Sequence, residues 1–143
     1  NHTGPDQHPD YVVPGLVRQV ARIEAGRQEP VVTLGDTTVV RDFTDVRDIV
    51  RGYRLLLEKG VVGEAYNLCS GRGTSIAELV EGYRALAAKP FTVATDPAKH
   101  RPSDLPRLVG DNAKIRRDTG WTPAIPLADL LRDLLQAWRE TER

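Results

Sequence analysis

The 143-residue sequence predicts a mixed fold of the α/β or α+β class. Stretches with helical apolar spacing alternate along the whole chain with short runs of β-branched residues, and no repeat or low-complexity tract interrupts them. Hydrophobic residues make up 40% and charged residues 28% of the chain, which is the composition of an ordinary globular protein. We therefore expect residues 1–143 to form a single piece with a core of its own.

The overall charge excludes some classes of function. Lysine plus arginine and aspartate plus glutamate each number 20, so nothing in the net charge favours binding to nucleic acid or to a membrane surface. The one cysteine, Cys69, lies in an apolar run and reads as a small buried hydrophobic residue. No stretch is typical of a transmembrane span or a signal peptide, so we expect a cytoplasmic protein. Because the chain begins at Asn1 and contains no methionine, we expect a cut or processed piece of a longer protein.

The first half of the chain predicts a loop, two helices and a hairpin. Turn-forming residues fill positions 1–10, and a helix follows with Pro14 in its first turn and Gly26 as its stop. The runs 31–34 and 38–43 flank Gly35-Asp36, which predicts a β-hairpin. The next helix begins at an Asp45 cap, ends at Gly60 and carries an apolar stripe of Val46, Ile49, Val50, Tyr53, Leu56 and Leu57.

The second half predicts two strands and three helices. In chain order these are a strand at 64–70, a helix that opens with a capping box of Ser75 and Glu78, a strand at 91–95, a short helix capped by Asp111 and ended by Gly120, and a last helix opened by Pro126.

Residues 66–80 have the outline of a dinucleotide-binding turn. An apolar run is followed by Gly71, Gly73 and a helix start, and an acid, Asp96, comes about twenty residues further on. Such a turn requires a third small residue where the helix packs on the strand, and Ile76 stands there instead. We therefore interpret the segment as an ordinary strand-to-helix turn whose glycines supply positive φ.

Other polar groups are weak candidates when taken one at a time. Arg41 ends a predicted strand and could offer its planar fork to a phosphate, but residues 39–48 alone favour a solvated charged turn. Arg101 lies in a proline-rich loop, where an arginine is more often ordinary surface. No histidine or cysteine spacing is typical of a metal site, no serine lies in a G-x-S-x-G context, and no tyrosine is followed four residues later by lysine, so we predict neither a metal nor a catalytic residue.

Several stretches, taken together and in this order, resemble the C-terminal part of the extended short-chain dehydrogenase/reductase family. They are "NHTGPDQ", "VVRDFTDVRDIVRGY", "GEAYNLCSGRGTSI", "RPSDLPRLVGD" and "TGWTPAIPL". The branch is that of nucleotide-sugar epimerases, dehydratases and reductases, with most similarity to GDP-4-keto-6-deoxy-D-mannose reductases and GDP-mannose 4,6-dehydratases. The helix opening "YVVPGLVRQV" favours the reductases, because the dehydratases carry Thr-Arg-Lys there.

The resemblance implies an α/β fold that is the substrate-binding part of a Rossmann-type enzyme. The dinucleotide-binding half, with the NAD(P) loop and the catalytic residues, is missing, so NAD(P) belongs to the intact parent and none is expected to bind this piece. The implied ligand is a nucleotide-diphosphate sugar, with a GDP-sugar favoured. The residues that the resemblance assigns to it are Asn1 at the phosphate or sugar, Arg41 at the diphosphate, Asn67 near the phosphates, Arg101 at the diphosphate or ribose, and Val32 and Leu34 at the base.

The resemblance also implies a partner. In the family the helix that matches residues 46–59 and the strand at 65–69 pack on the Rossmann domain, so Val46, Val50, Tyr53 and Leu57 would lose their cover here. We expect self-association or pairing with a separate N-terminal chain. Two functions stay open: the nucleotide-sugar-binding portion of an NAD(P)-dependent reductase or dehydratase, inactive alone, or a non-catalytic remnant or assembly module. An origin in another sugar-nucleotide epimerase also stays open.

Overall fold

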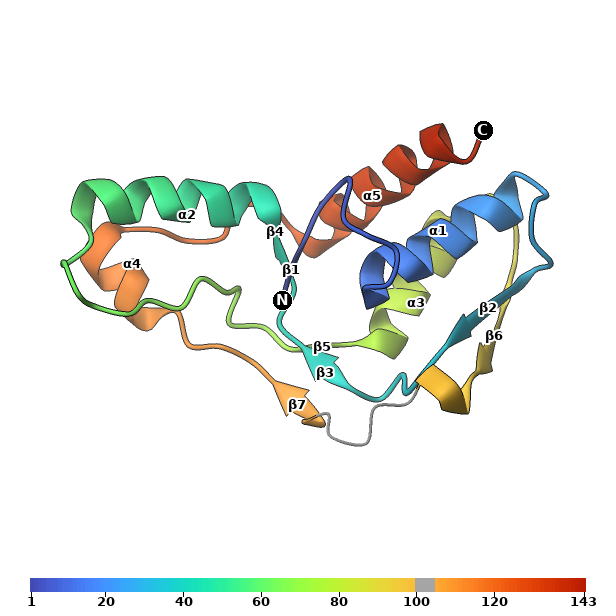
Figure 1. Cartoon of the computed structure of the whole chain (residues 1–143), viewed down its shortest axis with the longest axis horizontal. Coiled ribbons are helices and arrows are strands. Elements are labelled where there is room, and N and C mark those ends of the chain that lie inside the picture. Colours follow the sequence, from blue (N-terminus) through green and yellow to red (C-terminus); the bar gives the residue numbers. More distant parts are fainter. Residues whose placement is uncertain (100–104) are drawn as a thin grey trace.

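The computed structural model describes residues 1–99 and 105–143. In chain order its elements are β1 (His2–Thr3), α1 (Val12–Glu24), β2 (Val31–Leu34), β3 (Val40–Arg41), β4 (Thr44–Asp45), α2 (Val46–Lys59), β5 (Thr74–Ser75), α3 (Ile76–Leu86), β6 (Thr92–Thr95), a 3-10 turn η1 (Pro97–Lys99), β7 (Arg107–Leu108), α4 (Ala113–Thr119) and α5 (Leu127–Thr141). Figure 1 shows two lobes, one with α2 and α4 and the other with α1, α3, α5, β2 and β6, joined by the short strands in the middle.

The main core lies where helices α1, α3 and α5 pack on one another and on β2. The apolar stripes that predict these helices are the faces that become buried, among them Leu16, Leu79 and Leu134, none of which is exposed to solvent. Local signals also place the helix ends. Ser75 and Glu78 form the predicted capping box, and Gly26 takes a positive φ just beyond α1.

The predicted hairpin at 31–43 is wrong. Strand β2 pairs in parallel with β6, from Val31 opposite Thr92 to Leu34 opposite Thr95, while β3 lies between β5 and β7 in a different sheet. The parallel pairing turns Val32 and Leu34 into the core. The opposite edge of β2 is closed by a side chain, since Gln19 accepts from the Thr33 backbone N–H at 2.8 Å and donates to its carbonyl at 3.2 Å.

The strand predicted at 64–70 does not form, because no strand of the described residues pairs with it. Side chains hold the segment from one side instead. Asn112 donates to the Cys69 carbonyl at 2.8 Å, and Lys114 donates to the Ala65 carbonyl at 3.3 Å. The segment is therefore bound to the α4 region by side chains rather than by a β ladder.

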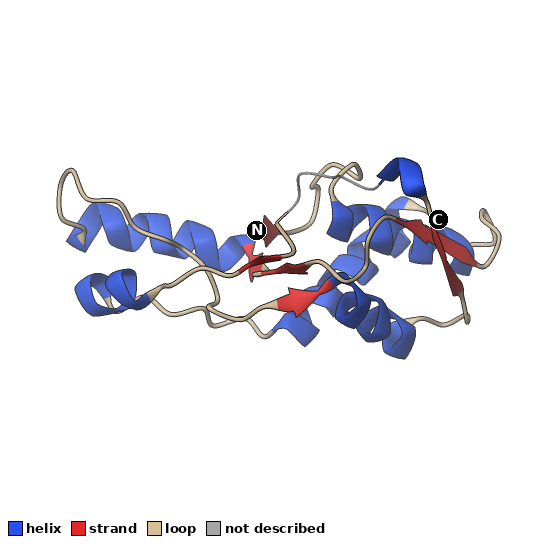
Figure 2. Cartoon of the chain, turned by 90° about the horizontal axis from the view of Figure 1, so that it is seen from below, coloured by secondary structure: helices blue, strands red, loops and turns tan. Residues whose placement is uncertain are grey.

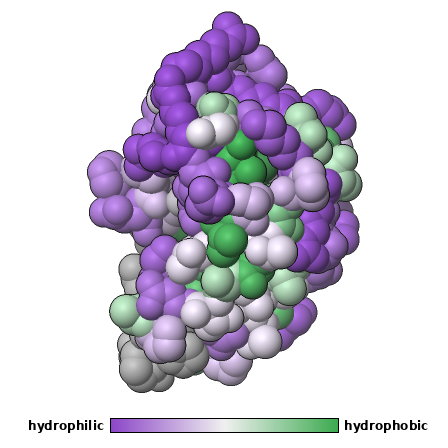
Figure 3. All heavy atoms as spheres, turned by 90° about the vertical axis from the view of Figure 1, so that its right-hand side faces the viewer, coloured by the Kyte–Doolittle hydropathy of each residue, from purple (hydrophilic) through white to green (hydrophobic). Residues whose placement is uncertain are grey.

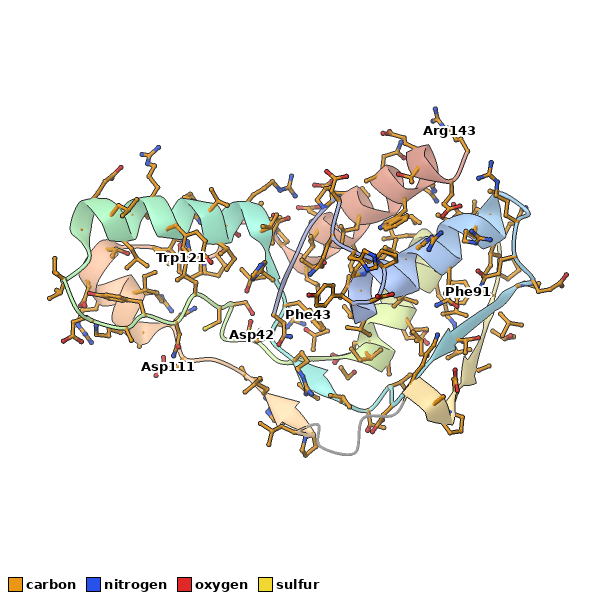
Figure 4. The ribbon with its side chains drawn as sticks, in the orientation of Figure 1. Asp42, Phe43, Phe91, Asp111, Trp121 and Arg143 are labelled. Carbon is orange, nitrogen blue, oxygen red and sulfur yellow. The ribbon has the colours of Figure 1, made fainter. Side chains whose placement is uncertain are left out.

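Helix α2 packs on α4 through Trp121, which is fully buried and donates its indole N–H to the Asp48 carbonyl at 2.9 Å. Figures 1 and 2 show α2 and α4 side by side, and Figure 4 shows Trp121 beneath α2. Gly52 leaves room for Leu68 and Trp121, since a Cβ there would collide with Leu68 Cδ2 and lie 3.0 Å from the Trp121 indole nitrogen. On the other face of α2, Val50, Tyr53 and Leu57 are 58%, 54% and 91% exposed, as the unpartnered stripe predicts, whereas Val46 is half-buried.

The opposite end of the molecule, around β2 and β6, has a hydrophilic surface with a narrow apolar band at its centre (Figure 3). No helix in the described parts of the chain is both long and apolar enough to cross a membrane.

Candidate functional site

Arg41 is held at the centre of the three-stranded sheet. It lies on β3, opposite Thr74 of β5 and Leu108 of β7, and is half-buried. Its Nη1 atom donates to the carbonyls of Val40 and Leu105 at 2.8 and 2.7 Å. The guanidinium is therefore fixed by backbone oxygens of this chain.

The other predicted site residues are distributed unevenly around β3. Asn1 lies beside the segment that follows β3. Its carbonyl accepts from the Thr44 backbone N–H at 3.1 Å, and β1 pairs in parallel with β4. Asn67 is exposed on the unpaired segment 64–70 and donates its side-chain amide to the Asp111 carbonyl at 3.2 Å. Arg101 lies outside the described residues.

Val32 and Leu34 are not surface residues. Val32 is fully buried and Leu34 is 6% exposed, and both belong to the core between β2 and the helices. Their side chains can only form the floor beneath a ligand, and the strand backbone and its outward-facing residues stand between them and solvent.

Asp42 organises the site, and the sequence reasoning missed it. Its carboxylate is 3% exposed and accepts from the backbone N–H groups of Ser70, Gly71 and Gly110 at 2.8, 2.9 and 3.3 Å. The Ser70 hydroxyl donates to it as well, at 2.5 Å. Figure 4 shows Asp42 beside Phe43 in the middle of the molecule. The available signal was the run Arg41–Phe43 itself, in which strand alternation turns Asp42 to the face opposite Arg41.

The charged turn predicted for residues 39–48 has the expected Asp45 cap, but it is not a solvated turn, because its aspartates are buried. Asp45 caps α2, accepting from the Arg47 backbone N–H at 2.7 Å, and also binds the Arg47 guanidinium. Asp48 accepts from the backbone N–H groups of Ala124 and Ile125 at 2.8 and 2.9 Å. Each carboxylate thus replaces its lost hydration with hydrogen bonds from the protein.

Ionisation of these groups follows from their contacts. Burial by itself would raise the pKa of Asp48, but the hydrogen bonds from Arg51, Ile125 and Ala124 outweigh it and hold that pKa below its usual value. Burial, together with the nearby charge of Asp42, raises the pKa of the Cys69 thiol. Cys69 is therefore a neutral buried thiol, as its apolar context predicts.

The turn at 70–75 does not fit a dinucleotide pyrophosphate. Gly71 has the predicted positive φ of 77°, but Gly73 serves a different need, since a Cβ there would lie 2.7 Å from Val40 and 2.9 Å from Val109. The start of α3 is already filled: Glu78 accepts from the Ser75 backbone N–H at 2.7 Å and from its hydroxyl at 2.8 Å. A carboxylate therefore stands where a pyrophosphate would need free N–H donors. Asp96, the acid that follows, accepts from the Ala98 N–H in the turn after β6.

No three histidine, cysteine, aspartate or glutamate side chains gather into a possible metal site within residues 1–99 and 105–143.

Comparison with known proteins gives a consistent set of relatives. GDP-6-deoxy-D-mannose reductase from Pseudomonas aeruginosa is 37% identical over 143 residues, covering 100% of this chain and 47% of that enzyme. UDP-glucose 4-epimerase from Bacillus subtilis is 30% identical over 144 residues, covering 93% of this chain and 40% of that enzyme. The structure of RMD from Pseudomonas aeruginosa complexed with NADPH has a TM-score of 0.92 and 35% identity, covering 99% of this chain and 46% of that one.

The chain thus spans under half the length of these relatives, and its α/β fold is that of their C-terminal part. The family model for GDP-mannose 4,6 dehydratase matches residues 1–134. The chain belongs to this family, within the epimerase and dehydratase branch of the extended short-chain dehydrogenases/reductases.

Proposed function

We propose that this chain is the nucleotide-sugar-binding portion of an NAD(P)-dependent nucleotide-sugar reductase or dehydratase, with a GDP-sugar as ligand. The observation that carries the proposal is the position of Arg41, which backbone carbonyls of this chain hold on the central strand of a sheet. Its relatives support the chemistry: one is a GDP-6-deoxy-D-mannose reductase, and another is solved as a complex with NADPH. Residues 1–143 alone are not catalytic in this proposal.

The proposed ligand contacts follow from the chemistry of a sugar nucleotide. Arg41 donates paired hydrogen bonds to the diphosphate, the group that best matches a planar guanidinium. Asn1 and Asn67 offer neutral amide donors near the phosphates and sugar, and Arg101 adds a second cation. The base lies over the backbone of β2 at Val32 and Leu34, whose side chains face the core.

NAD(P) is bound by a dinucleotide-binding part that residues 1–143 do not supply. The glycine-containing turn at 70–75 does not fit the cofactor, because Glu78 already occupies the N-terminus of α3. When bound in that other part, NAD(P) supplies the hydride transfer. The task of this chain is to hold the nucleotide and so to fix where the sugar lies.

The dinucleotide-binding part docks on the exposed apolar face of α2 and on segment 64–70. Val50, Tyr53 and Leu57 give that face an apolar stripe, and segment 64–70 has no strand partner among the described residues. An unpaired extended segment beside an apolar helix face suits the edge of a partner's sheet. Without that partner, the same surface makes the chain self-associate.

Calorimetric titration of the chain with GDP, UDP and NADPH tests the ligand. We expect GDP to bind more tightly than UDP, and NADPH to give no saturable signal. Arg41→Ala should weaken GDP binding about tenfold or more, because a charge-assisted pair to phosphate is lost. Arg116→Ala is the matched control, since Arg116 is exposed and its side chain donates to no described residue. Equal GDP affinity in wild type and Arg41→Ala would refute the role of Arg41.

A chain that binds no nucleotide has either no site or a site that needs the dinucleotide-binding part. The titration is therefore repeated with the dinucleotide-binding part of a relative added. If GDP still fails to bind, the chain is a non-catalytic module instead.

Light scattering with a dye for apolar surface tests the docking face. We expect the chain to associate with itself, and Tyr53→Glu with Leu57→Glu to make it monomeric and to lower dye binding. Leu108→Glu, at a side chain that is 49% exposed on β7, is the control and should change neither. A wild-type chain that is monodisperse and binds no dye would contradict the proposal.

A further inference from the structure

A cavity of about 280 Å³ lies between segments 70–74 and 123–127. Apolar side chains supply most of its lining, and three polar residues stand on one side. The lining residues are Phe43, Ser70, Arg72, Thr74, Pro123, Ala124, Ile125, Pro126 and Leu127. None of the residues proposed to contact the nucleotide sugar lines it.

The two walls of this cavity are held by two buried carboxylates. Asp42 accepts from the Ser70 N–H and hydroxyl and from the Gly71 N–H, which fixes the start of the first wall. Asp48 accepts from the N–H groups of Ala124 and Ile125, which fixes the second wall. The cavity is therefore already formed in the chain, and a ligand that enters it need not order its walls.

Two side chains on the polar side of the cavity have donors without a partner among the described residues. Arg72 is exposed, and its guanidinium donates to no acceptor among residues 1–99 and 105–143. Thr74 is 5% exposed, and its hydroxyl bonds to no group in those same two ranges. Arg72 and Phe43 line the same cavity, so the cation and the apolar floor face one volume.

The charge of the lining selects the sign of the ligand. Arg72 is its only charged residue. Glu78 is an acid whose carboxylate feels the charge of Arg72. Its pKa is lowered first by the hydrogen bonds from the Ser75 backbone and side chain, and to a lesser degree by the charge of Arg72. Ser75 holds the Glu78 carboxylate through Oε2, and no hydrogen bond joins that carboxylate to the Arg72 guanidinium within the described residues.

We propose that this cavity is a binding site for a small organic carboxylate with an apolar body. The carboxylate meets the Arg72 guanidinium and the Thr74 hydroxyl, which together provide charge and a directed donor. The apolar body lies against Phe43, Ile125 and Pro126. A volume at the low end of ligand pockets limits the body to about the size of one aromatic ring or a branched aliphatic chain.

Benzoate is the probe, followed by ¹⁵N–¹H NMR titration of the whole chain. We expect saturable shifts that cluster on the backbone amides of residues 70–74 and 124–127. Benzyl alcohol keeps the ring without the charge, and acetate keeps the charge without the ring, so each should bind about tenfold more weakly or worse. Shifts that never saturate, or equal affinity for benzyl alcohol, would overturn the proposal.

Two variants and a control assign the contacts. Arg72→Ala should weaken benzoate binding about tenfold, and Arg72→Lys should restore part of it, because lysine keeps the charge without the planar fork. Arg116→Ala is the control and should bind like wild type. Arg72 is exposed, so its variants fold, and a dispersed spectrum checks this. Benzoate that binds Arg72→Ala unchanged, or that competes with GDP at Arg41, would show that the cavity is not its site. The proposed GDP site is tested separately by Arg41→Ala.

Discussion

Replacing Asp42 with alanine should destabilise the chain more than any surface substitution. The carboxylate is 3% exposed and accepts from three backbone N–H groups, those of Ser70, Gly71 and Gly110. Ser70 and Gly110 are half-buried, so water can replace the lost acceptor only in part. At about 1 kcal/mol for each donor left without a partner, the free energy of unfolding should fall by about 3 kcal/mol.

Urea unfolding followed by circular dichroism measures this loss. Glu81→Ala is the matched control, because Glu81 is an exposed acid paired only with Arg84 on the surface of α3. Such a pair contributes about 0.5 kcal/mol or less, so the control should stay close to wild type. Asp42→Asn should fall between the two, since it keeps one acceptor oxygen but turns an N–H₂ group toward the remaining donors.

The result that would refute this reasoning is a loss for Asp42→Ala no larger than that for Glu81→Ala. It would mean that water fully replaces the carboxylate and that the segments around Ser70 and Gly110 do not depend on it. A loss for Asp42→Asn as large as that for Asp42→Ala would show that the charge, and not the acceptor geometry, is what matters.

Two further predictions concern neighbouring positions. Because the folded pKa of Asp48 is lowered, its ionised form contributes stability that is present above the unfolded pKa, near 3.8, and is lost as pH falls through the lower folded pKa. Asp48→Asn should therefore flatten the fall of unfolding free energy between about pH 5 and pH 3, and an unchanged slope in urea titrations at several pH values would contradict this. Gly73→Ala should cost about 1–3 kcal/mol through overpacking against Val40 and Val109, and thermal unfolding equal to that of Ala98→Ser, at an exposed position, would argue against it.

The helices could be predicted because their signals are local. Asp45, Ser75 with Glu78, and Gly120 each act on backbone groups within a few residues, so the sequence around them is sufficient. The cap predicted at Asp111 is wrong by one residue. The short helix starts at Ala113 with Asn112 as its N-cap, although Asp111 still accepts from the Ala113 N–H at 2.8 Å.

Strand pairing could not be predicted in the same way. The apolar run at 31–34 and the turn formers Gly35-Asp36 favour a hairpin locally, yet β2 pairs with β6, which lies about sixty residues away along the chain. The pairing of β2 with β6 is favoured because it places Val32 and Leu34 in the core formed with the three helices. No strand of the described residues pairs with segment 64–70, and no pattern within the segment shows whether a pairing strand is available.

The same difference between local and distant signals decides which residues of the candidate site could be predicted. Arg41 could be selected through the family resemblance of its stretch, and Arg101, selected likewise, lies outside the described residues. Asp42 was missed because its partners are 28, 29 and 68 residues away in sequence. The cavity was missed for the same reason, since its walls are segments 70–74 and 123–127.

The spacing of three buried aspartates explains how an isolated chain could keep a formed site. Asp42 fixes residues 70, 71 and 110, Asp45 fixes the start of α2, and Asp48 fixes residues 124 and 125. All three lie within seven residues of Arg41, the residue proposed to bind the diphosphate. The segment around Arg41 is therefore tied to both lobes by hydrogen bonds of this chain. A docking partner therefore need not shape the surroundings of Arg41. In the proposed function that partner covers the stripe of α2 and segment 64–70, so we expect docking to raise nucleotide affinity by adding contacts rather than by folding the site.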